Sequence, residues 1–282
     1  METIIKDNML SHVTLHNMLN LNQHGFLPKH STTSQFLECL QDWNYNSDSG
    51  TATDVIYIDF RKAFDSVSHS KLIQKLYTFS FCNNTINWIK CFLSDRTQAV
   101  RCCNSVSSSI SVSSGVPEGS VLGPLLFVLF VNDLPALCKP CQIKLYADDV
   151  KIFYKISNPA DRTTLQNCLD RVLTWSQSNK LIISIDKCSF LQIGYTDPTI
   201  SYNIGVNIIR TTNSVCDLGI AIDSTLKWSL HCIKIAKKAN SRANLILKSF
   251  LSRRPDHFIQ MLCPSYFRIC KSGVEPMSIA GY

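Results

Sequence analysis

The 282-residue sequence lacks the features that mark several protein classes. Only 17% of the residues are charged, with mean hydropathy +0.03 and just ten Gly and ten Pro, which excludes a collagen, a coiled coil and a disordered tail. The longest apolar run, residues 121–131, contains Gly123 and Pro124 and is too short for a membrane span, which needs about 20 residues. We interpret this run as a core helix and expect a soluble protein that does not bind membranes.

We expect no secretory leader, because Met1 is followed by the charged residues Glu2, Lys6 and Asp7. The thirteen Cys are odd in number and scattered, so we expect reduced thiols in an intracellular protein. Cys138 and Cys141 have a zinc-like spacing, but no second pair follows at a matching interval, so we do not expect structural zinc.

The net charge of +7 is concentrated in one late segment. Residues 227–271 contain ten basic side chains and one acidic side chain, whereas residues 1–226 are close to neutral. A local basic stretch suits a phosphate backbone, but it also fits the solvated face of a helix. Both interpretations stay open at this point.

The order of hydrophobic patterns predicts an α+β fold, with helices on one face of a mainly antiparallel sheet. Helices are expected over most of residues 1–45, with a second start near Ser31 or Thr32, and strands are expected where short apolar runs alternate. The other expected elements are a strand at 55–58, a helix at 124–137, a hairpin of 142–147 with 150–154, a helix through 165–175, a strand at 188–193 and a basic helix at 230–250.

Three acids stand where strands are expected to end. Asp59 follows the strand at 55–58, and Asp148 and Asp149 lie at the tip of the hairpin. Neighbouring strands of one sheet would gather these carboxylates, which are hard oxygen ligands suited to Mg²⁺. Two such ions can activate a hydroxyl and neutralise a leaving phosphate, although acids at strand ends also commonly cap turns.

The surrounding sequence resembles the reverse transcriptases of non-LTR (LINE-type) retrotransposons. Three motifs carry the resemblance in the family's order, and weaker similarity extends over roughly residues 1–262. The motifs are Asp54-Val-Ile-Tyr-Ile-Asp59-Phe-Arg-Lys-Ala-Phe64, Ser114-Gly-Val-Pro-Glu-Gly-Ser-Val-Leu-Gly-Pro124 and Leu145-Tyr-Ala-Asp-Asp149.

This resemblance implies an RNA-directed DNA polymerase with a right-hand fold. It implies partial fingers at 1–52, a palm at 53–226 with a fingers segment inserted at about 70–113, and the start of a thumb at 227–262. The expected partners are an RNA template, a DNA primer and a dNTP. The expected location is the nucleus, because the family primes synthesis at chromosomal targets.

The resemblance also implies roles for individual residues. Asp59 and Asp148 would hold two Mg²⁺ ions, for which Mn²⁺ can substitute, with Asp149 and the Phe60 carbonyl as further ligands. The primer 3′-hydroxyl would then attack the α-phosphate of the dNTP and release pyrophosphate. Lys187 matches a lysine that protonates this pyrophosphate, although an exposed lysine in a salt bridge is equally consistent with the sequence.

Other matched positions concern the nucleotide and the nucleic acid. Phe64 matches the steric gate that excludes a ribose 2′-hydroxyl, with an ordinary core Phe as the alternative. Glu118 and Gly119 lie in the loop that contacts the nascent base pair, where glycine allows close backbone approach. Residues expected to contact the primer or the template–primer backbone are Leu218, Gly219, Lys234, Lys237, Lys238, Arg242 and Lys248.

The chain departs from the family at the nucleotide site and at both ends. Glu118 stands where the family usually has Gln, and His30 where it commonly has Arg, so both changes remove charge favourable to a triphosphate. The start resembles the middle of the fingers, so we expect the upstream strands and the preceding endonuclease of the family to be missing, and residues 263–282 fit a frameshift near Met261. We therefore expect a truncated domain; the alternatives are an inactive remnant that at most binds nucleic acid, or a metal-dependent nuclease or phosphatase.

Overall fold

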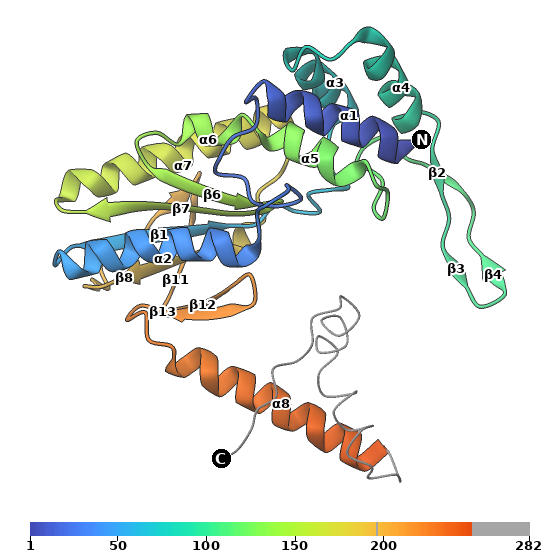
Figure 1. The fold of residues 1–282 in the computed structure, drawn as a ribbon. Helices are drawn as coiled ribbons and strands as arrows, with labels where there is room; N and C mark the ends of the chain where they lie inside the picture. Colours follow the sequence, from blue (N-terminus) through green and yellow to red (C-terminus); the bar gives the residue numbers. More distant parts are fainter. Residues whose placement is uncertain (196, 250–282) are drawn as a thin grey trace, which may run out of the picture. The chain divides into compact units, whose positions relative to one another are not determined.

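The computed structural model describes residues 1–195 and 197–249 of the chain (Figure 1). These residues form two compact units. The first contains Met1–Leu218 with Asp223–Leu226, and the second contains Gly219–Ile222 with the chain from Lys227 onward. The tail at 263–282, for which the sequence suggested a frameshift, lies outside the described residues.

Most of the helices belong to the first unit, and their starts have local causes. Ser31 caps one helix by accepting the Ser34 N–H, and the Ser34 side chain returns the contact. Asn158 and Asp161 form the same capping box at another helix, where Pro159 occupies the first turn. The helices are α1 Glu2–Leu15, α2 Thr32–Asp48, α3 His69–Thr78, α4 Asn83–Leu93, α5 Gly123–Val131, α6 Leu134–Leu137, α7 Pro159–Asn179, the short 3₁₀ helix η1 Ile185–Lys187, and α8 Ser229–Ser249.

The expected central sheet is present and has five strands in the order β11-β8-β1-β7-β6. All neighbouring pairs are antiparallel except β11 with β8, so the prediction of a mainly antiparallel sheet is confirmed. The strands are β1 Ala52–Ile58, β2 Thr97–Gln98, β3 Arg101–Cys102, β4 Ser105–Val106, β5 Ile110–Ser111, β6 Gln142–Tyr146, β7 Asp149–Ile156, β8 Ser189–Ile193, β9 Asn203–Ile204, β10 Asn207–Ile208, β11 Arg210–Thr212, β12 Ser214–Asp217 and β13 Ile220–Asp223.

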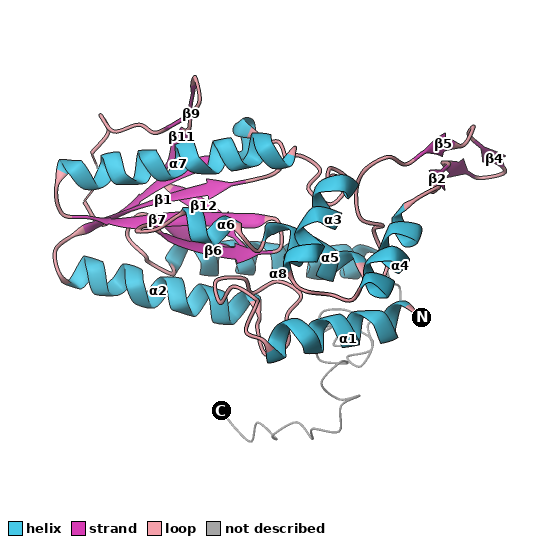
Figure 2. Cartoon of the chain, turned by 90° about the horizontal axis from the view of Figure 1, so that it is seen from above, coloured by secondary structure: helices cyan, strands magenta, loops and turns pink. Residues whose placement is uncertain are grey.

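Helices cover both faces of this sheet, which corrects the expectation that they lie on one face (Figure 2). Leu169 of α7 packs into the same core cluster as Ile56 of β1 on one face. On the other face, the Trp43 ring of α2 meets the Phe153 ring of β7 edge to face at 5.7 Å. The reason is visible in β1, where six of seven residues are buried, since a strand buried on both sides needs cover on both sides.

The apolar run that opens at Pro124 forms a core helix, as expected, but it ends earlier. α5 stops at Val131, and a separate short helix, α6, follows, so the single helix predicted over 124–137 is interrupted at Asn132 and Asp133. Eight of the nine residues of α5 are buried. Among the described residues, we find no helix with the length and apolarity needed to span a bilayer.

Candidate active site at the sheet edge

The fold brings the predicted acids to one edge of the sheet. β7 runs antiparallel to β1 and pairs Val150 with Ile58, so the residues just outside this pair, Asp149 on β7 and Asp59 after β1, share the edge. The β6–β7 hairpin closes where Tyr146 pairs with Asp149, leaving Ala147 and Asp148 as its turn. The sequence prediction of a hairpin with two acids at its tip is therefore confirmed.

The acids influence one another electrostatically. Burial raises the pKa of Asp148, the Asp59 carboxylate raises this pKa further, and the Lys187 charge lowers it. Burial raises the pKa of Asp149 to about 6, with further repulsion from Asp148, Asp217 and Asp59. Such crowding favours either protonation or a cation, because like charges that share a site cannot all ionise without cost.

Lys187 stands beside the first of these acids. Its Nζ atom lies 3.2 Å from Oδ1 of Asp59, and the two side chains are 64% and 35% exposed. The backbone of Asp59 is fixed as well, because its carbonyl accepts the Ser184 N–H at 2.8 Å. The structure thus places Lys187 in the salt bridge that the sequence left as one alternative, within reach of the shared carboxylate edge.

The donor set at this edge fits a hard divalent cation that keeps part of its own hydration shell. Within the described residues, no three His, Cys, Asp or Glu side chains group into an arrangement that could hold an ion by themselves. Mg²⁺ is ordinarily held by one or two carboxylates together with waters and substrate phosphates. Asp59 and Asp148 supply two carboxylates of this kind, and the repulsion felt by Asp148 is what such a cation would relieve.

A hollow of about 170 Å³ adjoins the acids, and Asp59, Asp149, Lys187 and Leu218 all line it. Lys151 and Asp217 line it too and form a buried ion pair there. Lys151 was not among the residues that the sequence predicted for the site. It stands between apolar residues in a predicted strand, and a charge buried at such a position needs a partner because an unpaired buried charge is too costly. This was the signal that could have identified it.

Phe64 lies close to the core without being fully buried. Its ring stacks on Phe127 at 4.4 Å between centroids, and Phe26 meets it edge to face at 6.1 Å. The Phe64 carbonyl accepts the Val116 N–H at 2.8 Å, which ties the segment after Asp59 to the loop that begins at Ser114. This position is compatible both with a packing role and with a gate. Phe60, the next residue after Asp59, buries its ring against Trp175.

Glu118 is not gathered with the acids. It is exposed and lines a second hollow, of about 300 Å³, together with Asp65, His69 and Arg96. Gly119 follows with a φ of 75°, a conformation suited to glycine, and its Cβ position is open. The loop itself is docked near its start, since Gly115 leaves no room for a side chain against the Asp65 backbone.

The remaining predicted residues fall into the second unit, apart from Leu218, which ends the first part of unit one. Leu218 has a φ of 48° and Gly219 one of 89°, so the chain turns sharply between them. On α8 of the second unit the predicted basic side chains are exposed, and they are Lys234, Lys237, Lys238, Arg242 and Lys248. Their exposure fits both interpretations of the charge pattern, a contact with a phosphate backbone and a solvated helix face.

Comparison with curated proteins finds relatives among the polymerases of mobile elements. The chain is 29% identical over 255 residues to a probable RNA-directed DNA polymerase from transposon BS of Drosophila melanogaster, covering 86% of this chain and 28% of that protein. It is 28% identical over 253 residues to the RNA-directed DNA polymerase from the mobile element jockey of the same fly, covering 83% and 26%. The chain therefore spans less than a third of the length of these relatives, and the matches confirm the resemblance to non-LTR retrotransposon polymerases.

Solved structures show the same fold at low sequence identity. Apo telomerase from Candida tropicalis, truncated from its C-terminal domain, matches with a TM-score of 0.55 and 11% identity over 80% of this chain and 44% of that chain. Telomerase from Candida albicans in complex with a fragment of telomeric RNA matches with 0.55 and 11% over 96% and 46%. The family described as reverse transcriptase (RNA-dependent DNA polymerase), whose members use divalent metal ions, matches residues 1–222. This chain belongs to that reverse transcriptase family.

Proposed function

We propose that this chain extends a DNA primer by copying an RNA template, with dNTPs as substrates. The observation that carries the proposal is the meeting of Asp59 and Asp148 at one sheet edge, with the Lys187 ammonium 3.2 Å from Asp59. Family membership supports the reaction class. The copying of RNA is also supported by the C. albicans telomerase, whose structure contains an RNA fragment.

Two Mg²⁺ ions, for which Mn²⁺ can substitute, would be held by the Asp59 and Asp148 carboxylates, with Asp149 and the Phe60 carbonyl nearby in the chain. When bound, such ions polarise the primer hydroxyl and neutralise charge on the departing pyrophosphate. The protein holds the carboxylates on the ends of paired strands, which are rigid supports for such a site. We assign to the Lys187 ammonium the donation of a proton to the leaving pyrophosphate, because it lies 3.2 Å from Asp59 in the proposed ion site.

Selection of the nucleotide is assigned to Phe64 and to the loop with Glu118 and Gly119. Phe64 is held by the Phe127 ring on one side, so its position is fixed before a nucleotide arrives. A fixed ring can exclude a 2′-hydroxyl by contact alone, which favours dNTPs. Leu218 and Gly219 are assigned to the primer, and the exposed basic side chains of α8 to the template–primer backbone. A chromosomal target would place this reaction in the nucleus.

RNA-templated primer extension tests the proposal. Purified protein is incubated with Mg²⁺, dNTPs and an RNA template annealed to a DNA primer, beside the variants Asp148→Ala and Glu118→Gln. We expect extension by the native chain, its loss by a factor of at least about 1,000 in Asp148→Ala, and an increase in Glu118→Gln because a negative charge facing a triphosphate is removed.

Two other outcomes would change the conclusion. Activity confined to Glu118→Gln would show a polymerase disabled by one carboxylate. The inactive remnant would be supported instead if the native chain and both variants are folded, none of them extends the primer, and the native chain still binds the template–primer in a gel-shift assay.

A further inference from the structure

A segment far from the hairpin in sequence lies along it like an additional strand. The Leu145 N–H donates to the Asn22 carbonyl at 2.9 Å, and the His24 N–H donates to the Leu145 carbonyl at 2.8 Å. A parallel bridge accordingly pairs Gln23 with Leu145. Residues 22–25 therefore support the end of β6 that leads directly into the turn with Asp148.

The side chain of Gln23 holds that turn. Its Oε1 atom accepts the Ala147 N–H at 3.0 Å and the Gly25 N–H at 2.7 Å, and the residue is 2% exposed. Ala147 has a φ of 57°, a conformation that alanine rarely adopts and that its surroundings must maintain. Since Ala147 is itself buried, the loss of this acceptor would leave a buried N–H without its partner.

The approach of the segment to the turn is too close for a side chain. A Cβ atom on Gly25 would lie 2.3 Å from the Ala147 nitrogen and 3.0 Å from the Tyr146 carbonyl carbon. Glycine at position 25 thus allows the segment to come close enough to the turn for the Gln23 carboxamide to reach the Ala147 N–H. The residue is required here by contact distance, not by an unusual backbone angle.

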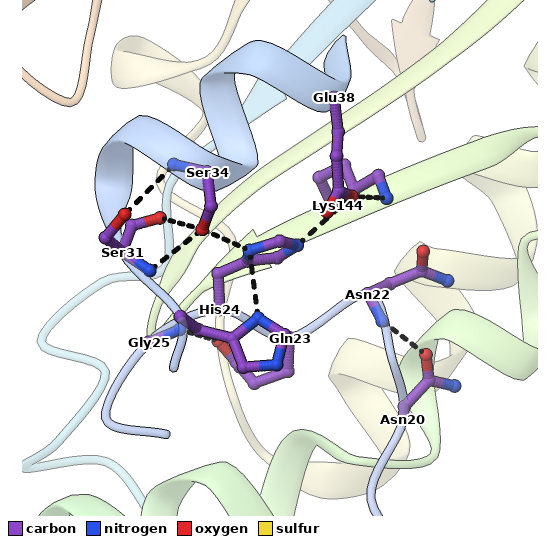
Figure 3. Close-up of polar contacts among 10 residues, drawn as sticks. Asn20, Asn22, Gln23, His24, Gly25, Ser31, Ser34, Glu38 and Lys144 are labelled. Carbon is purple, nitrogen blue, oxygen red and sulfur yellow. Dashed lines mark hydrogen bonds and ion pairs between the residues drawn. The ribbon is translucent and has the colours of Figure 1, made fainter. Parts of the chain in front are cut away.

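The segment is also fixed at its other end. The Asn22 N–H donates to Oδ1 of Asn20 at 3.0 Å, and the Asn20 N–H donates to Oδ1 of Asn132 at 2.8 Å (Figure 3 shows the first contact, with Gln23 and Gly25). Asn132 in turn donates to the Met18 carbonyl at 2.8 Å. Asn132 directly follows α5, so a continuous set of hydrogen bonds links the end of that buried helix to the turn.

We propose that Gln23 is a positioning residue for Asp148. Its carboxamide fixes the backbone of Ala147, the residue before Asp148, and so keeps the Asp148 carboxylate at the sheet edge beside Asp59, where the two would hold a divalent cation. The assignment rests on the proposed function for its effect on catalysis. Its effect on cation binding can be measured without any reaction.

The test compares two buried glutamines. Gln23→Met removes the acceptor and keeps the volume, and Gln23→Glu keeps an acceptor oxygen. Gln35→Met is the matched control, because Gln35 is completely buried on α2 and its side chain makes no hydrogen bond within the described part of the chain. Mn²⁺ binding is measured by electron paramagnetic resonance, and primer extension gives kcat and KM for the template–primer.

We expect Gln23→Met to weaken Mn²⁺ binding by about fivefold or more and to lower kcat at least about tenfold, with KM changed less than twofold, because misplacing a reacting group affects the chemical step. Gln35→Met should match the native protein, and Gln23→Glu should recover part of the Mn²⁺ affinity. Native Mn²⁺ affinity in Gln23→Met, or an equal loss in Gln35→Met, overturns the proposal.

Deuterium exchange on the native protein supplies a measurement that needs no variant. Addition of Mn²⁺ should slow exchange at 145–149 and at 22–25 together, since the two segments share hydrogen bonds; slowing at the first segment alone overturns the proposal. If the native chain binds Mn²⁺ but extends no primer, the proposed function is wrong. The comparison of Mn²⁺ affinity between the native chain, Gln23→Met and Gln35→Met still decides the role of Gln23. A native chain that binds no Mn²⁺ overturns the proposal as well.

Discussion

Strand β1 contains Asp54 near its start and is followed directly by Asp59. The two aspartates differ in burial and in the charges around them. Asp54 has no exposed side-chain surface; it accepts the Tyr202 hydroxyl at 2.6 Å and lies 3.5 Å from Nε of Arg162. Asp59 is partly exposed, contacts Lys187, and lies close enough to Asp148 for its charge to raise the pKa of that carboxyl. The same residue type is thus held by a hydroxyl and a guanidinium at one end of the strand, both at Oδ2, and is a partly exposed carboxylate among other acids at the other end. Within the described residues, Oδ1 of Asp54 makes no hydrogen bond.

The sign of the neighbouring charges therefore distinguishes the two aspartates better than burial alone. Burial raises the pKa of Asp54, but the Tyr202 hydroxyl and the Arg162 charge offset it, and no other carboxylate is among the main causes. At the other end, the causes acting on Asp148 and Asp149 include their acidic neighbours. Carboxylates that repel one another and have raised pKa values are typical of sites that bind or act on a ligand.

The largest expected effect is on activity at the exposed end. Asp59→Asn removes one carboxylate of the proposed ion site, so primer extension should fall by at least about 1,000-fold. Its melting temperature should stay the same or rise, because the repulsion on Asp148 is relieved. Extension assays and thermal unfolding on the same preparation check both, and a variant that melts lower while keeping its activity would reverse the assignment of the two ends.

The next effect is on stability at the buried end. Asp54→Leu leaves the Arg162 charge and the Tyr202 hydroxyl without their partner, which should lower the free energy of unfolding by about 3 kcal/mol. Urea denaturation measures this loss. Protein that remains folded should extend primers at the native rate. Loss of extension without loss of stability would contradict the structural role of Asp54.

Lys187 provides an intermediate test. Lys187→Met removes the ammonium beside Asp59 but leaves the acids in place, so primer extension should fall roughly 100-fold if the group donates a proton. The side chain is largely exposed, so the free energy of unfolding should barely change. A normal extension rate would leave Lys187 as a surface salt bridge only.

The smallest expected effect is a pH dependence of stability. The folded-state pKa of Asp54 is raised, so the folded protein holds the proton more tightly than the unfolded chain does. The stability from this group is therefore full at acidic pH below the unfolded value and declines as pH rises through the folded pKa. The free-energy difference between the native chain and Asp54→Asn should be larger near pH 4 than near pH 7, as measured by urea denaturation; a difference that grows with pH would refute the sign.

Much of the site could be predicted because its signals are local. The alternation on both sides of Asp148 and Asp149 indicated the hairpin, and a short β-branched run before Asp59 indicated the strand, since each pattern follows from side-chain direction along an extended chain. The central sheet then followed from their pairing. The break between α5 and α6 was missed, although Asn132, Asp133 and Pro135 follow the apolar run and residues of these types commonly end a helix and begin another.

Contacts that depend on distant segments could not be predicted. The covering of both sheet faces depends on how α2 returns across the strands, and the buried pair of Lys151 with Asp217 joins residues from different elements. The contact of Gln23 with Ala147 spans 124 positions in the sequence. Periodicity and spacing carry no information on such pairs, although the apolar run at 55–58, which does not alternate with polar residues, was a clue that both faces of the strand are covered.

The pairing of β1 with β7 and β8 has a consequence for how this protein forms. β1 is synthesised early, but both of its neighbours in the sheet follow about a hundred or more residues later, and the partner of Gln23, Ala147, follows it by 124 residues. Such long-range closure is entropically slow, so the nascent chain carries an apolar strand with two unpaired edges until β7 emerges and with one until β8 does. Folding of this domain should therefore be late and sensitive to aggregation, and the acids can meet only after β7 has paired with β1.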